Sequence, residues 1–137
     1  MTRSEDCSDI PGTYLFDKWA CVKGYNLNMF CMSLIKEENR RRFLENSAGY
    51  LDQYSLTSSQ TRAILDRNWL KIIQEGGNVH FVAKLGATCG FSCEEMAASM
   101  SGMTKEDYRK MMQAGGRPIE GNRSKAVQDI LVEREHA

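Results

Sequence analysis

Signals for the start of a helix recur along this chain, and apolar residues at helical spacing follow each of them. In each signal, a hydroxyl residue stands three positions before a side chain that can return its hydrogen bond. The three clearest pairs are Thr57 with Gln60, Ser92 with Glu95, and Thr104 with Asp107. Glycines stand where the first and last of these helices should end, at Gly76 and Gly115. The chain is therefore predicted to be helical.

Apolar periodicity outlines these helices. One amphipathic helix is expected within residues 24–46, with the charged run KEENRRR on its solvated side and an apolar face. That face is formed by Leu27, Phe30, Cys31, Leu34, Ile35 and Phe43. A second helix is expected to run from Thr57 to Gly76, with Ile64, Leu65, Trp69, Ile72 and Ile73 on one face. The helices after Ser92 and Thr104 carry Met96, Ala97 and Met100, and Tyr108, Met111 and Met112.

The remaining segments are harder to assign. Residues 78–86, NVHFVAKLG, fit both a strand and a helix, and we expect a short helix because an isolated strand would have nothing to pair with. Residues 1–22 are expected to be irregular, with a turn at Pro11-Gly12. Residues 124–135 favour a final exposed helix.

The length of 137 residues is that of one domain. We therefore expect a single compact all-α domain over residues 1–137, with about six helices joined by glycine-rich loops. Its ends, residues 1–10 and 125–137, are expected to be peripheral.

Charge and hydropathy exclude several classes of protein. With 18 basic and 18 acidic residues, the chain has no excess charge that would favour nucleic acid or an anionic membrane. The N-terminus has no signal-peptide pattern, and the apolar stretch 29–35 is too short to span a bilayer. A cytoplasmic protein with no membrane or nucleic-acid partner is expected.

The five cysteines indicate reduced thiols rather than a disulfide framework. His80, Cys89 and Cys93 are the one cluster with metal-ligand chemistry, and they lack the second close pair of ligands that zinc sites have. We expect buried or incidental thiols and no metal ligand.

No catalytic site is apparent. His80 and His136 are the two histidines, and His136 lies close to the end of the chain. The H-E-x-x-H and G-x-S-x-G motifs are absent, and Gly115-Gly116 follows a helix whereas phosphate loops precede one. We therefore predict no catalytic residue in this chain.

Several uncommon sequence blocks occur in a fixed order. They are DIPGTYLFD (9–17), KGYNLNMFCMSL (23–34), ENRRRF (38–43), YLDQYSLT (50–57), EGGNVHFVAKLGAT (75–88), SMSGMTKEDYRKMMQAGGR (99–117) and EGNRS (120–124). In this order they resemble the small (alpha) subunits of protocatechuate 4,5-dioxygenases, which are class II extradiol ring-cleaving dioxygenases. The resemblance covers residues 9–124. Residues 125–137 share no pattern with the family, and Pro118 directly follows Arg117 where the family has a small residue first.

The resemblance implies an accessory subunit. In this family alpha and beta subunits assemble, usually two of each. The beta subunit binds a non-haem Fe(II) through histidines and a glutamate, and it also carries the catalytic base. The iron binds O2 and the catechol, and the ring opens at the 4,5 bond of protocatechuate to give 4-carboxy-2-hydroxymuconate semialdehyde. The helical alpha subunit carries no iron ligand and covers the mouth of the active site, where excluding water strengthens local electrostatics.

Two segments are candidates for contact with such a site. Residues 86–100 form the least regular apolar segment between capped helices, and we expect Phe91, Cys93 and Met96 to lie near the beta pocket and the aromatic substrate.

The second segment is rich in methionine and arginine. Met111 and Met112 either fill gaps in the core or contact the partner. Arg117 and Arg123 are expected to pair with beta carboxylates or the substrate carboxylate, or within the subunit with helix carbonyls or Glu120.

Other functions remain open at this point. A small subunit for gallate or methylgallate would have a similar sequence, because the partner forms most of the pocket. A non-catalytic helical binding protein without a dioxygenase partner is a third reading. A self-sufficient enzyme would require turnover by this chain with Fe(II) alone.

Overall fold

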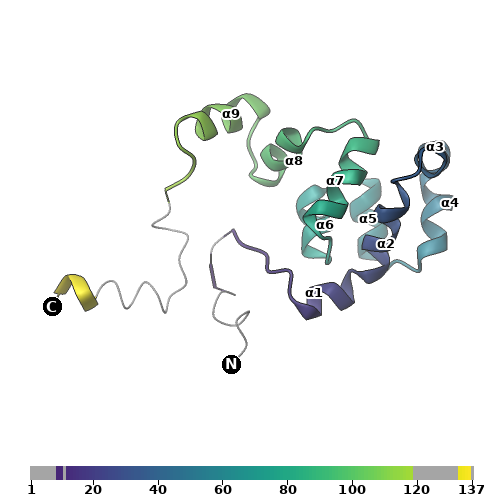
Figure 1. Cartoon of the computed structure of the whole chain (residues 1–137), viewed down its shortest axis with the longest axis horizontal. Helices are drawn as coiled ribbons and strands as arrows, with labels where there is room; N and C mark the ends of the chain where they lie inside the picture. Colours follow the sequence, from purple (N-terminus) through teal and green to yellow (C-terminus); the bar gives the residue numbers. More distant parts are fainter. Residues whose placement is uncertain (1–8, 11, 119–132, 137) are drawn as a thin grey trace.

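Helices account for most of the chain between residues 18 and 113. The computed structural model describes residues 9–10, 12–118 and 133–136, and no strand occurs among them. The helices are α1 (Lys18–Lys23), α2 (Tyr25–Ser33), α3 (Glu37–Glu45), α4 (Ser47–Leu51), the 3-10 helix η2 (Asp52–Tyr54), α5 (Ser58–Leu65), α6 (Trp69–Gln74), α7 (Val79–Thr88), α8 (Cys93–Met100) and α9 (Lys105–Gln113). Figure 1 shows α2 to α7 gathered together, with α8 and α9 extending from them. The predicted all-α class is confirmed.

Several sequence-based assignments are confirmed in detail. Residues 79–88 are helical, as expected for the ambiguous segment. The cap residues Thr57, Ser92 and Thr104 each accept a hydrogen bond from the backbone three positions later. The turn near the N-terminus is present as well, since the Thr13 amide donates to the Ile10 carbonyl. Residues 133–136 are helical, whereas the rest of the expected final helix lies outside the described residues.

The expected helix within residues 24–46 is in fact two helices, and the reason lies in the charged run. The Arg40 guanidinium donates to the carbonyls of Leu34 and Ile35, at 2.9 and 2.8 Å. The Asn39 amide donates to the Ser33 carbonyl at 2.8 Å. These side chains of α3 satisfy the carbonyls left free at the end of α2, so the chain can turn there without unpaired polar groups. Part of the KEENRRR run therefore shapes the fold.

The expected helix from Thr57 to Gly76 is also divided, into α5 and α6. Arg67 adopts a left-handed conformation (φ 54°), which ends α5. The Asn68 amide donates to the Ala63 carbonyl, and the Asn68 side chain then caps α6. The sequence carries no glycine or proline here, so the break was not predictable from helix-breaking residues. One consequence is that Leu65 points outward rather than into the core.

Helix α1 was not expected, because residues 1–22 were predicted to be irregular. The Asp17 carboxylate accepts a hydrogen bond from the Ala20 amide at 3.0 Å and thereby starts the helix. Gly24 ends it, with its amide donating to the Ala20 carbonyl at 2.8 Å.

Phe30 lies at the centre of an aromatic cluster between α2, α3, α4 and η2. It is fully buried, and its ring lies 5.2 Å from that of Phe43 and 5.7 Å from that of Tyr54, centroid to centroid. Such tilted and edge-to-face ring pairs add to the hydrophobic gain of burial. The hydrophobic core extends beyond this aromatic cluster, and its buried residues besides Phe30 and Phe43 are Leu27, Cys31, Leu34, Tyr50, Leu51, Ala63, Ile64, Trp69, Ile72, Val82, Leu85 and Met96.

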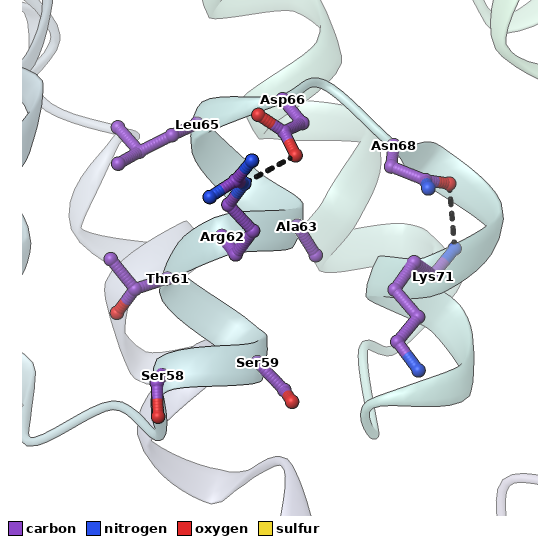
Figure 2. Close-up of a pocket in the computed structure, with 9 residues that line it drawn as sticks. All are labelled: Ser58, Ser59, Thr61, Arg62, Ala63, Leu65, Asp66, Asn68 and Lys71. Atoms are coloured by element: carbon purple, nitrogen blue, oxygen red, sulfur yellow. Dashed lines mark hydrogen bonds and ion pairs between the residues drawn. The ribbon is translucent and has the colours of Figure 1, made fainter.

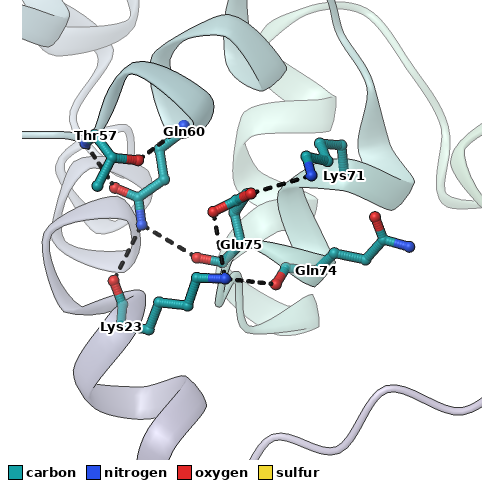
Figure 3. A network of polar contacts seen from close by, with 6 residues as sticks. All are labelled: Lys23, Thr57, Gln60, Lys71, Gln74 and Glu75. Atoms are coloured by element: carbon teal, nitrogen blue, oxygen red, sulfur yellow. Dashed lines mark hydrogen bonds and ion pairs between the residues drawn. The ribbon is translucent and has the colours of Figure 1, made fainter.

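A buried glutamine joins α1, α5 and the end of α6 (Figure 3). Gln60 is 2% exposed, and its side-chain amide donates to the carbonyls of Lys23 and Glu75, at 3.0 and 3.1 Å. Its side-chain oxygen accepts from the Thr57 amide, which completes the predicted capping box. Lys23 and Lys71 also pair with the Glu75 carboxylate, at 3.4 and 3.2 Å. One side chain thus caps a helix and holds three segments together.

Two glycines meet at the same junction. A Cβ atom on Gly24 would lie 1.9 Å from the Gly76 carbonyl oxygen, and one on Gly76 would lie 2.6 Å from the Gly24 nitrogen. Asn28 fastens this contact, because its side chain donates to the Gly76 carbonyl and accepts from the Asn78 amide. The close approach fixes where α1 and α2 stand relative to α6 and α7.

Candidate functional site

The methionine-rich helix α9 packs on α8 and buries none of its own residues. The Arg109 guanidinium donates to both carboxylate oxygens of Glu94, at 2.9 and 3.2 Å, and so ties α9 to α8. These bonds, with the Glu94 charge, raise the pKa of Arg109. Lys105 of α9 also pairs with Glu95 of α8, at 3.8 Å. Helix α9 is amphipathic and fixed in position, but the rest of the chain leaves its apolar side chains half-buried or exposed. These are the features of a contact surface.

A groove of about 460 Å³ runs between α9 and the start of the described chain. It is lined by Ile10, Gly12, Thr13, Ser101, Tyr108, Met111, Met112 and Arg117. Met112 is 52% exposed, Met111 is half-buried and Arg117 is exposed. The Arg117 guanidinium lies 4.0 Å from the Met103 sulfur. The structure therefore brings together three of the four residues predicted to contact a partner, while Arg123 lies outside the described residues.

The three residues predicted to lie near a substrate are not equivalent. Phe91 is half-buried, and its ring contacts that of Trp69 at 5.2 Å. Met96 is 5% exposed and belongs to the core, where its sulfur lies under Gly86. Cys93 is exposed at the first residue of α8. Their proximity to a substrate stays a prediction, and Cys93 is the one with the exposure that direct contact requires.

A shallow hollow of about 710 Å³ lies on the surface between α5 and α6 (Figure 2). Its charged groups have partners: Arg62 pairs with Asp66 at 2.9 Å, and Lys71 pairs with Glu75. The side-chain oxygen of Asn68 accepts from the Lys71 amide at 3.1 Å. No histidine or cysteine lines this hollow, so it supplies neither of the side chains used most often as general base or thiol nucleophile.

The potential metal ligands lie apart from one another in the described part of the chain. His80 is exposed in the first turn of α7, and Cys89 follows the last turn of the same helix. Within the described residues, no three or more histidine, cysteine or acidic side chains gather closely enough to hold a metal ion. These residues do not fit an iron site.

The buried thiol of Cys31 is expected to be unreactive as a nucleophile. Burial, with a smaller contribution from the neighbouring Cys89, raises the pKa of Cys31 to about 12. Burial also raises the pKa of Cys89. Both thiols therefore stay protonated near neutral pH, and neither provides a nucleophilic thiolate.

A second exposed surface is not predicted from the sequence, because helix α1, on which it lies, is not predicted either. Residues 12–17, called the strap below, lead into α1. Six large apolar side chains are exposed on the strap, α1 and α2, which follow one another in the chain: Tyr14, Phe16, Trp19, Val22, Tyr25 and Met29. We call these six residues the N-terminal surface. The signal in the sequence was the run KWACVK after Asp17, which places a tryptophan and a valine three positions apart.

Among the described residues, no helix is both long and apolar enough to cross a membrane.

Comparison with known proteins decides the family. Residues 27–113, from within α2 to the end of α9, match the family described as aromatic-ring-opening dioxygenase LigAB, LigA subunit. The chain belongs to this family. The LigA family match confirms the resemblance to the small subunits of ring-cleaving dioxygenases. The strap and α1 precede the matched residues.

A relative of known identity is the gallate dioxygenase of Pseudomonas putida strain KT2440. It is 31% identical to this LigA-family chain over 101 residues, which are 74% of this chain and 30% of the relative. The chain thus spans about 30% of the length of the relative it matches. In that protein, the LigA-like segment is covalently joined to a larger remainder.

Proposed function

We propose that this chain is the accessory small subunit of an extradiol dioxygenase that opens protocatechuate at the 4,5 bond with O2. Membership of the LigA family carries the proposal. The partner is the catalytic beta subunit, and the assembly contains two copies of each. Free cysteines at Cys31 and Cys89 are in keeping with a cytoplasmic location.

The iron belongs to the partner. Fe(II) in the beta subunit supplies the chemistry that joins O2 to the catechol ring. We assign the iron ligands and the catalytic residues to the beta subunit, as membership of the LigA family suggests, and none to this chain. Its own side chains bind the partner and keep bulk water from the shared pocket, which strengthens electrostatic interactions there.

The groove along α9 is our first candidate for the partner-binding surface. Met111 and Met112 offer adaptable apolar contacts, and Arg117 offers a guanidinium that can pair with a carboxylate of the partner or of the substrate. Arg123 is proposed for the same role. Methionine and arginine are both enriched at protein–protein interfaces relative to the rest of the surface.

The start of α8 is our candidate for the rim of the substrate pocket. Cys93 stands exposed there, and the ring of Phe91 supports the loop before it by packing on Trp69. Met96 supports this rim from the core, because it packs under Gly86 and holds α8 against α7.

A gallate-cleaving enzyme is the alternative, favoured by the gallate dioxygenase relative. Gallate carries one more ring hydroxyl than protocatechuate. Initial rates of the assembled enzyme on the two substrates separate the two cases.

Replacing Met112 by glutamate is expected to weaken association with the catalytic subunit at least about tenfold, because it places a charge within an apolar contact. Calorimetric titration of the purified catalytic subunit measures the dissociation constant. Leu44→Glu is the matched control, since Leu44 is similarly exposed, at 55%, on α3. Equal affinity of the Met112→Glu variant and the unmodified chain would exclude α9 from the interface.

A further inference from the structure

The N-terminal surface is the feature that the known family leaves unexplained. We propose that the catalytic chain also covers this surface, with Trp19 and Val22 as its anchors, so that the strap, α1 and the α9 groove form one continuous docking site. The inference rests on the proposed function, since it names where the same partner binds.

Exposure is the first observation. Trp19 is 70% exposed and Val22 is 75% exposed. Helix α1 is KWACVK, so four of its six residues are apolar, yet it buries none. Tryptophan is among the residues most enriched at the energetic centres of interfaces, where a pocket of the partner encloses it.

Rigidity is the second observation, because α1 is fixed even though its side chains are uncovered. Asp17 caps its start, and Gln60 holds the Lys23 carbonyl at its end. Gly24 packs directly against Gly76. A helix whose ends are held does not have to order its backbone on binding. The exposure therefore belongs to an ordered surface rather than to a frayed end.

The exposed area is the third observation. Four of the six residues are aromatic, and an aromatic side chain buries about 150–250 Å² when fully covered. With about half of each exposed, the aromatic residues alone leave roughly 300–500 Å² of largely apolar surface. Apolar patches of about 300–600 Å² are the largest found on ordinary monomers and are often functional. A stable interface needs about 800 Å² per partner, so this patch requires a neighbouring contact to complete it.

The strap connects the N-terminal surface with the α9 groove. Its beginning lines the α9 groove through Gly12 and Thr13. Its next residues, Tyr14 to Phe16, line a second cleft of about 270 Å³ beside the start of α7, with Val79 and His80. The strap then enters α1. Figure 1 shows this path running from beneath α9 to α1 along one side of the molecule. The α9 groove and the N-terminal surface are thus joined by the strap.

The catalytic chain, rather than a second copy, is the occupant that the observations favour. The LigA family is a subunit of a two-component enzyme, and in the gallate dioxygenase the matching segment is joined to a larger remainder of different sequence. One cation borders the surface, because the Lys18 ammonium lies 5.1 Å from the Trp19 ring centroid. The facing patch of the catalytic chain is therefore expected to combine an apolar pocket for Trp19 with a carboxylate that meets Lys18.

The test measures binding of the purified catalytic beta subunit, encoded by the same genome, to the full-length chain. Trp19→Ser and Val22→Ser are each expected to raise the dissociation constant at least tenfold, whereas the control Leu44→Ser leaves it within twofold. Both sites are exposed, so unfolding midpoints should match that of the unmodified chain. A second readout needs no variant: alkylation of Cys21 on α1, followed by mass spectrometry, is expected to slow at least tenfold in the complex.

The outcomes separate this inference from the proposed function. If the unmodified chain binds and Trp19→Ser binds equally well with Cys21 still reactive, the inference is wrong and the proposed function stands. If the unmodified chain does not bind the catalytic subunit, the proposed function fails and the inference fails with it. If the chain alone forms a dimer that Trp19→Ser abolishes, the surface belongs to a second copy and the inference is overturned.

Discussion

Gly24→Ala is expected to lower the free energy of unfolding by at least about 3 kcal/mol, at the upper end of the usual cost of overpacking. The added Cβ would lie 1.9 Å from the Gly76 carbonyl oxygen, which is backbone and cannot rotate away. Separating the two segments also strains the hydrogen bonds of Gln60 and Asn28 across the junction. For a chain of this size, the unfolding midpoint should fall by on the order of 10 °C. Urea denaturation followed by circular dichroism measures the effect.

Gly102→Ala is the control for this substitution. Gly102 has φ 68°, and a Cβ there meets nothing within 4 Å. The change should therefore cost about 1–2 kcal/mol of backbone strain alone. Gly24 has φ −94°, outside the left-handed region that favours glycine, so steric overlap is the main cause at that site. Equal losses for the two variants would show that the contact between Gly24 and Gly76 contributes nothing special.

Phe30→Ala is expected to destabilise the fold by about 3–5 kcal/mol, because it leaves a cavity at the centre of the aromatic cluster. Domains of this size are stable by only about 5–15 kcal/mol, so much of the variant should be unfolded at elevated temperature. The Phe30 ring contacts Phe43, Tyr50 and Tyr54. Thermal unfolding monitored by near-UV circular dichroism reports the loss of this packing.

Leu44→Ala provides the comparison for Phe30→Ala. Leu44 lies on α3 next to Phe43 but is exposed, so truncation should change stability by less than about 0.5 kcal/mol. A loss at Phe30 as small as the loss at Leu44 would mean that the cluster can collapse around the cavity.

The all-α class and the starts of α5, α8 and α9 could be predicted because they depend on local hydrogen bonds. Thr57, Ser92 and Thr104 cap helices with groups three positions away, and such pairs are visible in the sequence. Helix α1 was missed because Asp17 caps it without a recognisable partner at the third position.

The breaks inside the two expected long helices depend on contacts that periodicity does not show. Arg40 satisfies carbonyls at the end of α2 from the next helix. Arg67 takes a left-handed conformation that usually indicates glycine or asparagine. In both places, a side-chain or backbone contact overrides a continuous apolar period.

The candidate interface could be predicted only in part. The methionines of α9 and Arg117 were recognised from composition, and the structure places them in one groove. The N-terminal surface was not predicted, because the run KWACVK indicates a helix but does not show that Trp19 lacks a tertiary neighbour. A tryptophan in a short apolar run is ordinarily expected to be buried. Met96 is the opposite case: it was predicted to lie near the substrate, but it is buried because it packs closely against Gly86.

The most direct test of the proposed accessory role is the rate of O2 consumption by the iron-loaded catalytic subunit, with protocatechuate or gallate, as this chain is added. The rate is expected to rise at least about tenfold, equivalent to about 1.4 kcal/mol of barrier, and to level off at equal amounts of the two chains. This chain with Fe(II) alone should show no turnover. Ring cleavage by this chain alone, or a catalytic subunit whose rate is unchanged at saturating amounts of it, would contradict the account.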